Sequence, residues 1–162
     1  MNAAPEPAAL TLTTDSPDGT LDLGRRLGGI VQPGDVLALI GPLGAGKTML
    51  VKGIALGLGV DSAREVTSPT FVLMNVHQGR LDLYHFDAYR LDSARQMHEI
   101  GCEEAFYGKG VSVVEWADRV PDCLPADHVT IDIAITGDTT RTIEVSGSGP
   151  NAHALVDRLA QA

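Results

Sequence analysis

Apolar and polar positions change in blocks along this chain, and the blocks predict where strands and helices lie. The segment 9–14 alternates and predicts a strand, whereas 35–40 is almost wholly apolar, as in a strand buried on both faces of a parallel sheet. Ser16 and Pro17 indicate a helix start, because serine is a good N-cap and proline fits the first helical position. A helix over 47–58 is apolar nearly all round, which predicts that it is buried.

The rest of the chain predicts hairpins, helices and one more short strand. These are a hairpin of strands 71–76 and 81–86, a helix over 93–107 that breaks near Gly101, a strand over 111–114, a hairpin of 129–136 and 141–146, and an amphipathic helix over 151–161. Strands that alternate with helices, together with two hairpins, predict an α/β fold with a mostly parallel central sheet and antiparallel hairpin additions. Residues 1–7 are rich in Ala and Pro and predict a flexible tail, with 8–162 as a single domain.

Glycines inside the predicted helices indicate two further features. Gly28 and Gly29 are expected to weaken the end of the first helix, since glycine is a poor helix former. Gly53 and Gly57 lie four residues apart in the next helix, a spacing that predicts close packing against a neighbouring element.

Amino-acid composition and net charge narrow the range of functions that the chain can have. Hydrophobic residues make up 44% of the 162 residues and aromatic residues only 4%, so Leu, Val, Ile and Ala are expected to form most of the core. The formal net charge is −9, whereas a protein that binds nucleic acid by itself usually carries a basic surface. The acidic balance argues against direct binding of nucleic acid and leaves open a local site for an anion.

The sequence predicts a cytoplasmic protein with no membrane contact. The N-terminus lacks the basic and apolar regions of a signal peptide, and no stretch approaches the ~18 apolar residues of a membrane span. Cys102 and Cys123 have neither metal-ligand spacing nor a disulfide-scaffold pattern, which is typical of reduced cytosolic thiols.

The segment "GPLGAGKT" (41–48) carries the strongest chemical signal in the chain. It has the spacing Gly-x-x-x-x-Gly-Lys-Thr between a buried strand and a helix, where backbone N–H groups and the helix N-terminus can surround a polyphosphate. Lys47 is expected to bridge the β and γ phosphates, and the Thr48 hydroxyl to hold Mg²⁺. The structural alternative is a glycine-rich turn between strand and helix. The predicted nucleotide-binding residues are Gly41, Leu43, Gly44, Ala45, Gly46, Lys47, Thr48 and Met49, together with Trp116.

A nucleoside triphosphatase also needs a carboxylate at the end of a neighbouring strand, to hold the metal shell or to orient water. Glu115 ends "VSVVE" and Asp87 ends "LYHFD", so both are candidates, and the sequence does not decide which activates water. Each is also explained as a solvated carboxylate at a strand end. The chain lacks the Asn-Lys-x-Asp segment that gives guanine specificity, which favours adenine.

Other residues near these motifs allow two interpretations each. Thr67, Ser68 and Thr70 are hydroxyls that could sense a γ-phosphate like a switch segment, or could cap a proline turn. Trp116 either packs at a strand end or stacks near the nucleotide. His85 is expected to pack internally or to point to solvent.

Four segments in order, "GPLGAGKT", "TSPTF", "YHFDAYRL" and "VVEW", together resemble the bacterial TsaE (YjeE) family. The resemblance covers about 35–116, half of the chain, and the last three segments are far more specific than the phosphate loop alone. It implies a three-layer fold of the P-loop NTPase type and hydrolysis of ATP with Mg²⁺. The family's phosphate-binding lysine corresponds to Lys47, and its metal and catalytic positions to Thr48, Glu115 and Asp87.

The same resemblance implies a place in the threonylcarbamoyladenosine modification of tRNA. It implies action with a complex of TsaD and TsaB, in which TsaD transfers the threonylcarbamoyl group to adenosine 37 and the TsaE-type ATPase resets the complex between turnovers. The acidic charge fits indirect contact with tRNA through these partners. Two alternatives stay open: a P-loop small-molecule kinase, and a non-catalytic module in which ATP orders an interaction surface.

Overall fold

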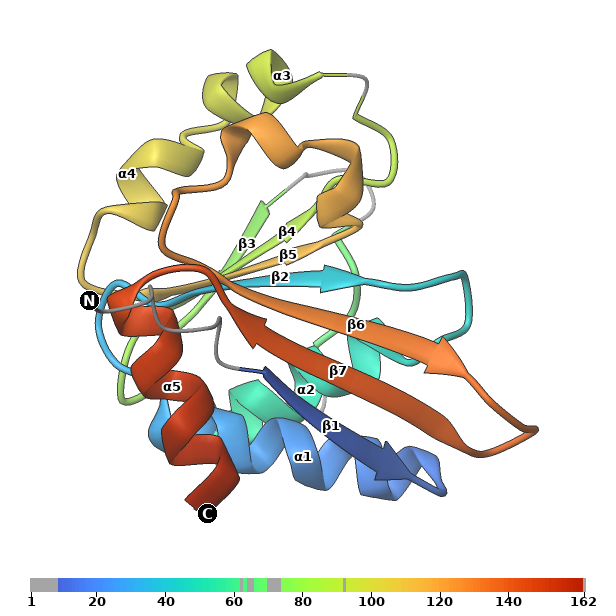
Figure 1. Cartoon of the computed structure of the whole chain (residues 1–162). Helices are drawn as coiled ribbons and strands as arrows, with labels where there is room; N and C mark the ends of the chain where they lie inside the picture. Colours follow the sequence, from blue (N-terminus) through green and yellow to red (C-terminus); the bar gives the residue numbers. More distant parts are fainter. Residues whose placement is uncertain (1–8, 62, 64–65, 70–73, 92, 162) are drawn as a thin grey trace, which may run out of the picture.

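The computed structural model describes residues 9–61, 63, 66–69, 74–91 and 93–161, and these residues form a seven-stranded sheet with helices on both faces (Figure 1). The strands are β1 (Ala9–Thr14), β2 (Val36–Ile40), β3 (Met74–His77), β4 (Leu83–Asp87), β5 (Val111–Glu115), β6 (Val129–Ile135) and β7 (Arg141–Gly147). Their order across the sheet is β1-β7-β6-β2-β5-β4-β3. The predicted tail over 1–7, the strand start over 71–73 and Thr70 lie outside the described residues.

The centre of the sheet is parallel and its margins are antiparallel. β2 pairs in parallel with β5 and with β6, and β4 pairs in parallel with β5. β3 pairs antiparallel with β4, and β7 pairs antiparallel with both β6 and β1. This arrangement confirms the predicted α/β class. Because β2, β4 and β5 run in the same direction, their carboxyl ends meet at one edge, where ligands bind in open α/β sheets.

Helices make the outer two of three layers (Figure 1). One face of the sheet is covered by α1 (Pro17–Ile30), α2 (Lys47–Gly57) and α5 (Pro150–Gln161), over a large aliphatic core. The other face is covered by α3 (Ala94–Glu99), α4 (Cys102–Phe106) and two 3₁₀ turns, η2 (Ala117–Arg119) and η3 (Pro121–Cys123), over a second core. The region predicted as one broken helix is thus two short helices, separated at Gly101, which has φ 87°.

Glycines bring α1 and α2 into backbone contact. Gly24 lies against Gly53, and Gly28 lies against Gly57, so that a Cβ added at Gly53 would come within 2.2 Å of the Leu21 carbonyl oxygen. This contact confirms that Gly53 and Gly57 serve close packing. α1 continues through Gly28 and Gly29 to Ile30, and Gly28 packs there against the backbone of α2.

Candidate functional site

The glycine-rich loop, residues 41–46, connects β2 to α2 at the carboxyl edge of the sheet. Gly44 has φ 80° and Gly46 has φ 105°, in the left-handed region that side chains other than glycine rarely adopt. Gly46 is also the N-cap of α2, and no side chain caps that helix end. The first N–H groups of α2 therefore have no partner within the helix and are available to an acceptor in front of the loop.

Lys47 is folded back onto the loop that precedes it. Its Nζ donates hydrogen bonds to the carbonyl oxygens of Gly41 at 2.6 Å and Pro42 at 2.8 Å. The same ammonium lies 3.9 Å from the centroid of the Trp116 ring, a cation–π contact. Burial lowers the pKa of Lys47, while the nearby carboxylates of Glu115, Asp118 and Asp87 act in the opposite direction. An anion that enters the site offers this ammonium a stronger acceptor than the carbonyls do.

Glu115 is the centre of a buried polar network. Its Oε1 accepts from the Thr48 hydroxyl at 2.9 Å, and its Oε2 accepts from the Ser68 hydroxyl at 3.1 Å and lies 2.5 Å from His85 Nε2. The hydroxyls of Thr48 and Ser68 are themselves 2.6 Å apart. Glu115 is 2% exposed and His85 is fully buried. The network joins the start of α2, the loop before β3, and the strands β4 and β5 around one carboxylate.

Of the two placements expected for His85, the structure has the internal one, because the side chain is fully buried. Its Nε2 also contacts the Glu115 carboxylate, a partner that the sequence did not predict. The signal in the sequence is the two-residue period of a strand, which places His85 and Asp87 on the same face of β4. Asp87 is in register with Glu115 on β5, so His85 and Glu115 are diagonal neighbours.

Asp87 lies beside Glu115 at the same edge. Its Oδ1 accepts a hydrogen bond from the Tyr89 N–H at 2.9 Å. Burial raises the pKa of Asp87, and the charge of Glu115 adds to that effect. Trp116 follows directly, with its backbone in the left-handed region at φ 58° and its ring 4.9 Å from that of Tyr89. Trp116 thus packs against Tyr89 and also covers Lys47.

These groups surround a pocket of about 390 Å³, here called the main pocket. It brings together nearly all of the predicted site residues, and adds Tyr89, which lies in the segment "YHFDAYRL" but was not predicted as a site residue. The lining residues are Leu43, Gly44, Ala45, Gly46, Lys47, Thr48, Met49, Ser68, Asp87, Tyr89, Glu115 and Trp116. Gly41 contributes its carbonyl to Lys47 instead of lining the pocket. Thr67 is exposed and does not line it.

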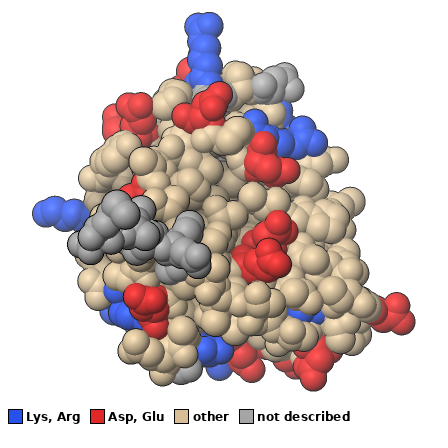
Figure 2. Space-filling view, in the orientation of Figure 1, with Lys and Arg blue, Asp and Glu red and all other residues tan. Residues whose placement is uncertain are grey.

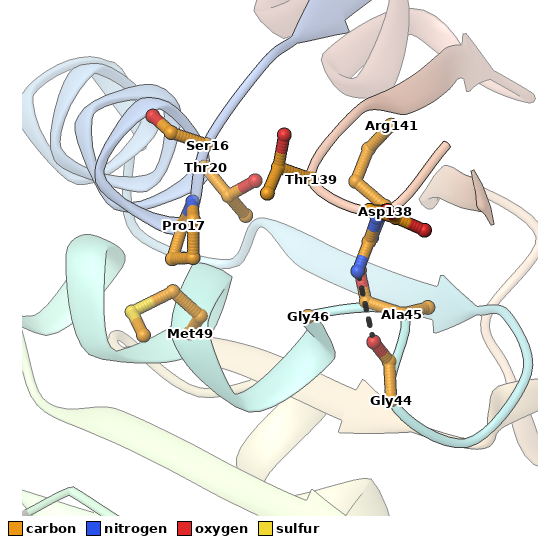
Figure 3. A pocket seen from close by; sticks show the side chains of 10 residues that line it. All are labelled: Ser16, Pro17, Thr20, Gly44, Ala45, Gly46, Met49, Asp138, Thr139 and Arg141. Carbon is orange, nitrogen blue, oxygen red and sulfur yellow. Dashed lines mark hydrogen bonds between the residues drawn. The ribbon is translucent and has the colours of Figure 1, made fainter. Parts of the chain in front are cut away.

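A second hollow of about 180 Å³ lies behind the same loop (Figure 3). It is bounded by the start of α1, the first turn of α2 and the turn between β6 and β7, and sequence reasoning missed it because these segments are far apart in the chain. Its lining residues are Ser16, Pro17, Thr20, Gly44, Ala45, Gly46, Met49, Asp138, Thr139 and Arg141. Gly44, Ala45, Gly46 and Met49 line both cavities, so this rear hollow and the main pocket share the loop as a wall.

Charge and hydropathy of the described residues add two observations. On the face shown in Figure 2, carboxylates are spread over the surface and basic side chains lie mainly near its outline, without a continuous basic patch. No helix in the described part of the chain is long and apolar enough to cross a membrane.

Comparisons with known proteins agree with this architecture. The family model described as "Threonylcarbamoyl adenosine biosynthesis protein TsaE" matches residues 14–143. The tRNA threonylcarbamoyladenosine biosynthesis protein TsaE of Treponema pallidum is 47% identical over 131 residues, which cover 81% of this chain and 96% of that protein. The protein of the same name from Bacillus subtilis is 38% identical over 149 residues, with coverage of 91% and 92%.

A solved structure supports the same assignment at the level of the fold. The crystal structure of Bacillus subtilis YdiB superimposes with a TM-score of 0.81 at 33% sequence identity, and the match covers 98% of each chain. Family model, relatives and fold agree over most of the sequence. The chain therefore belongs to the TsaE family and takes part in the biosynthesis of threonylcarbamoyladenosine in tRNA.

Proposed function

We propose that this protein is a cytoplasmic, Mg²⁺-dependent ATPase that acts with the TsaD–TsaB complex during formation of threonylcarbamoyladenosine at position 37 of tRNA. The observation that carries the proposal is the convergence in one pocket of Lys47, Thr48 and Glu115 with the uncapped start of α2. The acidic composition supports indirect contact with tRNA, through the partner proteins.

The triphosphate tail is proposed to lie in the main pocket. The N–H groups at the start of α2 and the positive end of its dipole favour an anion there. Lys47 already lies in this pocket, and its present acceptors are two neutral carbonyls. When phosphate oxygens enter, the ammonium can exchange those carbonyls for charged acceptors, which form stronger hydrogen bonds.

The residues around Thr48 fit a magnesium ion. Mg²⁺ prefers oxygen ligands and usually takes one or two carboxylates or hydroxyls, with water and substrate phosphate as the rest. Thr48 Oγ1 and Glu115 Oε1 are 2.9 Å apart and both face the main pocket, so they would hold the ion or its water shell. When bound, the ion would neutralise charge on the phosphate oxygens. In the described residues, no cluster of three or more His, Cys, Asp or Glu side chains forms a metal site independent of substrate.

The carboxylates of Glu115 and Asp87 are proposed to have different roles, one at the metal ion and one at the attacking water. Glu115 accepts a hydrogen bond from the Thr48 hydroxyl, which is proposed to bind the metal ion. We therefore assign Glu115 to the metal ion as well. Asp87 forms no hydrogen bond with Thr48 and lines the same pocket, and burial raises the pKa of its carboxyl group. Asp87 is therefore our candidate for orienting the attacking water.

The nucleoside half of the ligand is proposed to occupy the rear hollow. The phosphate tail would lie beside Lys47 and Thr48. The nucleoside would then extend past Met49 into the rear hollow, because Met49 lines both cavities. Pro17, Met49 and the methyl group of Thr20 offer apolar surface to a base, and Asp138 offers an acceptor (Figure 3).

The test is reconstitution with TsaD, TsaB, tRNA, the threonylcarbamoyl donor, Mg²⁺ and ATP, in which modified nucleoside is measured over many turnovers. Wild-type protein should sustain turnover, and Glu115→Gln should bind ATP but abolish hydrolysis and repeated turnover. Glu144→Gln, an exposed change of the same kind on β7, is the matched control and should behave as wild type.

Other results would contradict the proposal in different ways. Phosphate that appears on a small metabolite instead of as free inorganic phosphate would indicate a kinase. Full modification activity in Glu115→Gln, with no hydrolysis in either protein, would indicate a non-catalytic module that ATP merely orders. Modification that proceeds equally well without this chain would exclude the role altogether.

A further inference from the structure

Arg141, the first residue of β7, ties the β6–β7 turn to the glycine-rich loop. Its Nη1 donates to the carbonyl oxygens of Gly137 at 3.1 Å and Thr140 at 2.9 Å, within its own turn. Its Nε donates to the Ala45 carbonyl at 3.0 Å and its Nη2 to the Gly44 carbonyl at 3.3 Å (Figure 3). A single guanidinium thus holds carbonyl groups from two segments that lie far apart in the sequence.

The hydrogen-bond acceptors of the Arg141 guanidinium are main-chain carbonyl groups. No carboxylate within the described residues forms an ion pair with Arg141. A guanidinium has five N–H donors in a fixed plane, and four main-chain carbonyls around it use most of them. Its positive charge lies behind a loop proposed to bind a polyanion, in a hollow that Asp138 also lines.

Arg141 and Lys47 hold different halves of the same loop. Lys47 takes the carbonyls of Gly41 and Pro42, whereas Arg141 takes those of Gly44 and Ala45. Lys47 lines the main pocket and Arg141 lines the rear hollow, so the two cations lie on opposite sides of the loop. Lys47 must release its carbonyls to reach phosphate, whereas nothing in that step requires Arg141 to move.

Peptide geometry connects the arginine to the groups that face the ligand. In a trans peptide the C=O and the following N–H point in opposite directions. The bond from Arg141 to the Ala45 carbonyl therefore directs the Gly46 N–H away from the arginine, to the side of the main pocket. Gly46 has a left-handed backbone with wide conformational freedom, so this peptide would otherwise be free to rotate.

We propose that Arg141 is a positioning residue that keeps the glycine-rich loop in its phosphate-binding shape after Lys47 has left the loop carbonyls. The inference rests on the proposed function, since it assumes that the loop binds the tail of a nucleotide. Arg141 acts through the loop and not through the nucleoside, although its side chain lines the rear hollow. We therefore expect the affinity for any ligand with a polyphosphate tail to depend on Arg141, whether or not the ligand has a base.

The test compares two probes, Mg·ATP and inorganic tripolyphosphate with Mg²⁺, by calorimetry on the full chain. Arg141→Met should weaken both by a similar factor, about tenfold or more, because charge-assisted hydrogen bonds to the loop are lost. Arg141→Lys keeps the charge but not the planar donor set and should recover only part of the affinity. Arg80→Met is the matched control, because Arg80 also binds main-chain carbonyls, those of Gly28 at 2.9 Å and Val31 at 3.1 Å, away from the site.

Hydrogen exchange of the ligand-free proteins supplies a readout that does not depend on binding. Arg141→Met should accelerate exchange in the peptide that covers 41–48, and Arg80→Met should not. Weakened binding of ATP with unchanged tripolyphosphate affinity would assign Arg141 to the nucleoside instead and overturn the proposal, as would unchanged affinity for both. If the wild-type chain bound neither probe, the proposed function would fail first, which separates the two failures.

Discussion

The ammonium group of Lys47 rests 3.9 Å from the centroid of the Trp116 ring, while Trp116 has its backbone in the left-handed region at φ 58°. A left-handed conformation costs a bulky residue about 1–2 kcal/mol, so the surrounding contacts must compensate for it. Those contacts include the ring of Tyr89, the Lys47 ammonium and the guanidinium of Arg119, which lies 5.8 Å from the centroid of the Trp116 ring. Trp116 and the carbonyl groups of Gly41 and Pro42 together surround the Lys47 ammonium.

A double-mutant cycle between Lys47→Met and Trp116→Leu measures this contact. We expect the two changes to be non-additive, with a coupling free energy of about 0.5–2 kcal/mol, because a partly desolvated cation–π pair has that strength. The measurement is urea unfolding of the wild type, both single variants and the double variant without nucleotide. Strict additivity would show that the two side chains are close without interacting.

His85 is predicted to control turnover through Glu115. His85→Phe keeps an aromatic ring at this position but removes the Nε2 group, so the carboxylate loses one of its three partners and part of its orientation. We expect kcat in the reconstituted reaction to fall about 10–100-fold, the usual effect of losing a group that orients a metal ligand. The KM for ATP should change little, because Lys47 and the loop are untouched.

His85→Gln is the matched comparison, since its side-chain amide can still donate to the Glu115 carboxylate. It should recover a large part of the kcat that His85→Phe loses. Equal loss in both variants would indicate that His85 serves packing alone. Loss of ATP affinity with unchanged kcat would place His85 outside the reaction.

Local sequence patterns predict the loop and the sheet edges because their determinants are short-range. The glycine spacing, the lysine and the hydroxyl lie within eight consecutive residues, 41–48, and each strand end is indicated by an apolar run followed by a carboxylate. Parallel strands then bring those ends together, which is why Asp87 and Glu115 could be expected at one site.

Local sequence patterns do not predict contacts that depend on strand register or on segments far apart in the chain. The bond between His85 and Glu115 requires the pairing of β4 with β5, which is set by tertiary packing and not by either strand alone. Arg141 reaches the loop across 96 positions of sequence, and no local pattern indicates such a contact. Thr67 shows the opposite case, because it shares a polar motif with Ser68 yet is exposed and does not line the pocket.

The interface of α1 and α2 makes a prediction about folding stability. Gly53→Ala would place a methyl group 2.2 Å from the Leu21 carbonyl oxygen, so the helices must separate. We expect the free energy of unfolding to fall by about 2 kcal/mol or more, as overpacking at a backbone contact does. The control is Gly29→Ala, where no atom lies within 4 Å of the added Cβ, and which should stabilise the protein by up to ~1 kcal/mol through helix propensity. Thermal unfolding of both variants decides the matter, and similar stability in the two would contradict the packing argument.

Asp35 is predicted to make stability depend on pH at the end of the sheet opposite the site. It is 7% exposed and precedes β2, where its Oδ2 accepts from the Gln32 N–H at 2.8 Å and lies 3.8 Å from Arg158. Burial raises the pKa of Asp35 above its ordinary value of 3.8, in spite of these favourable contacts. The folded state therefore holds the proton of Asp35 at pH values where the unfolded chain has released it.

The sign of the effect follows from this linkage. Stability rises with pH only where the unfolded state binds more protons, and for Asp35 the folded state binds more. The contribution of this group is fully present below pH 3.8 and is lost as the pH rises through its pKa in the folded protein. Asp35→Asn does not titrate, so its free energy of unfolding relative to wild type should decrease as the pH is lowered from 7 toward 4. Urea unfolding at several pH values measures this difference. A constant difference would show that the contacts with Gln32 and Arg158 balance burial, and an increase toward acid would show that they outweigh it.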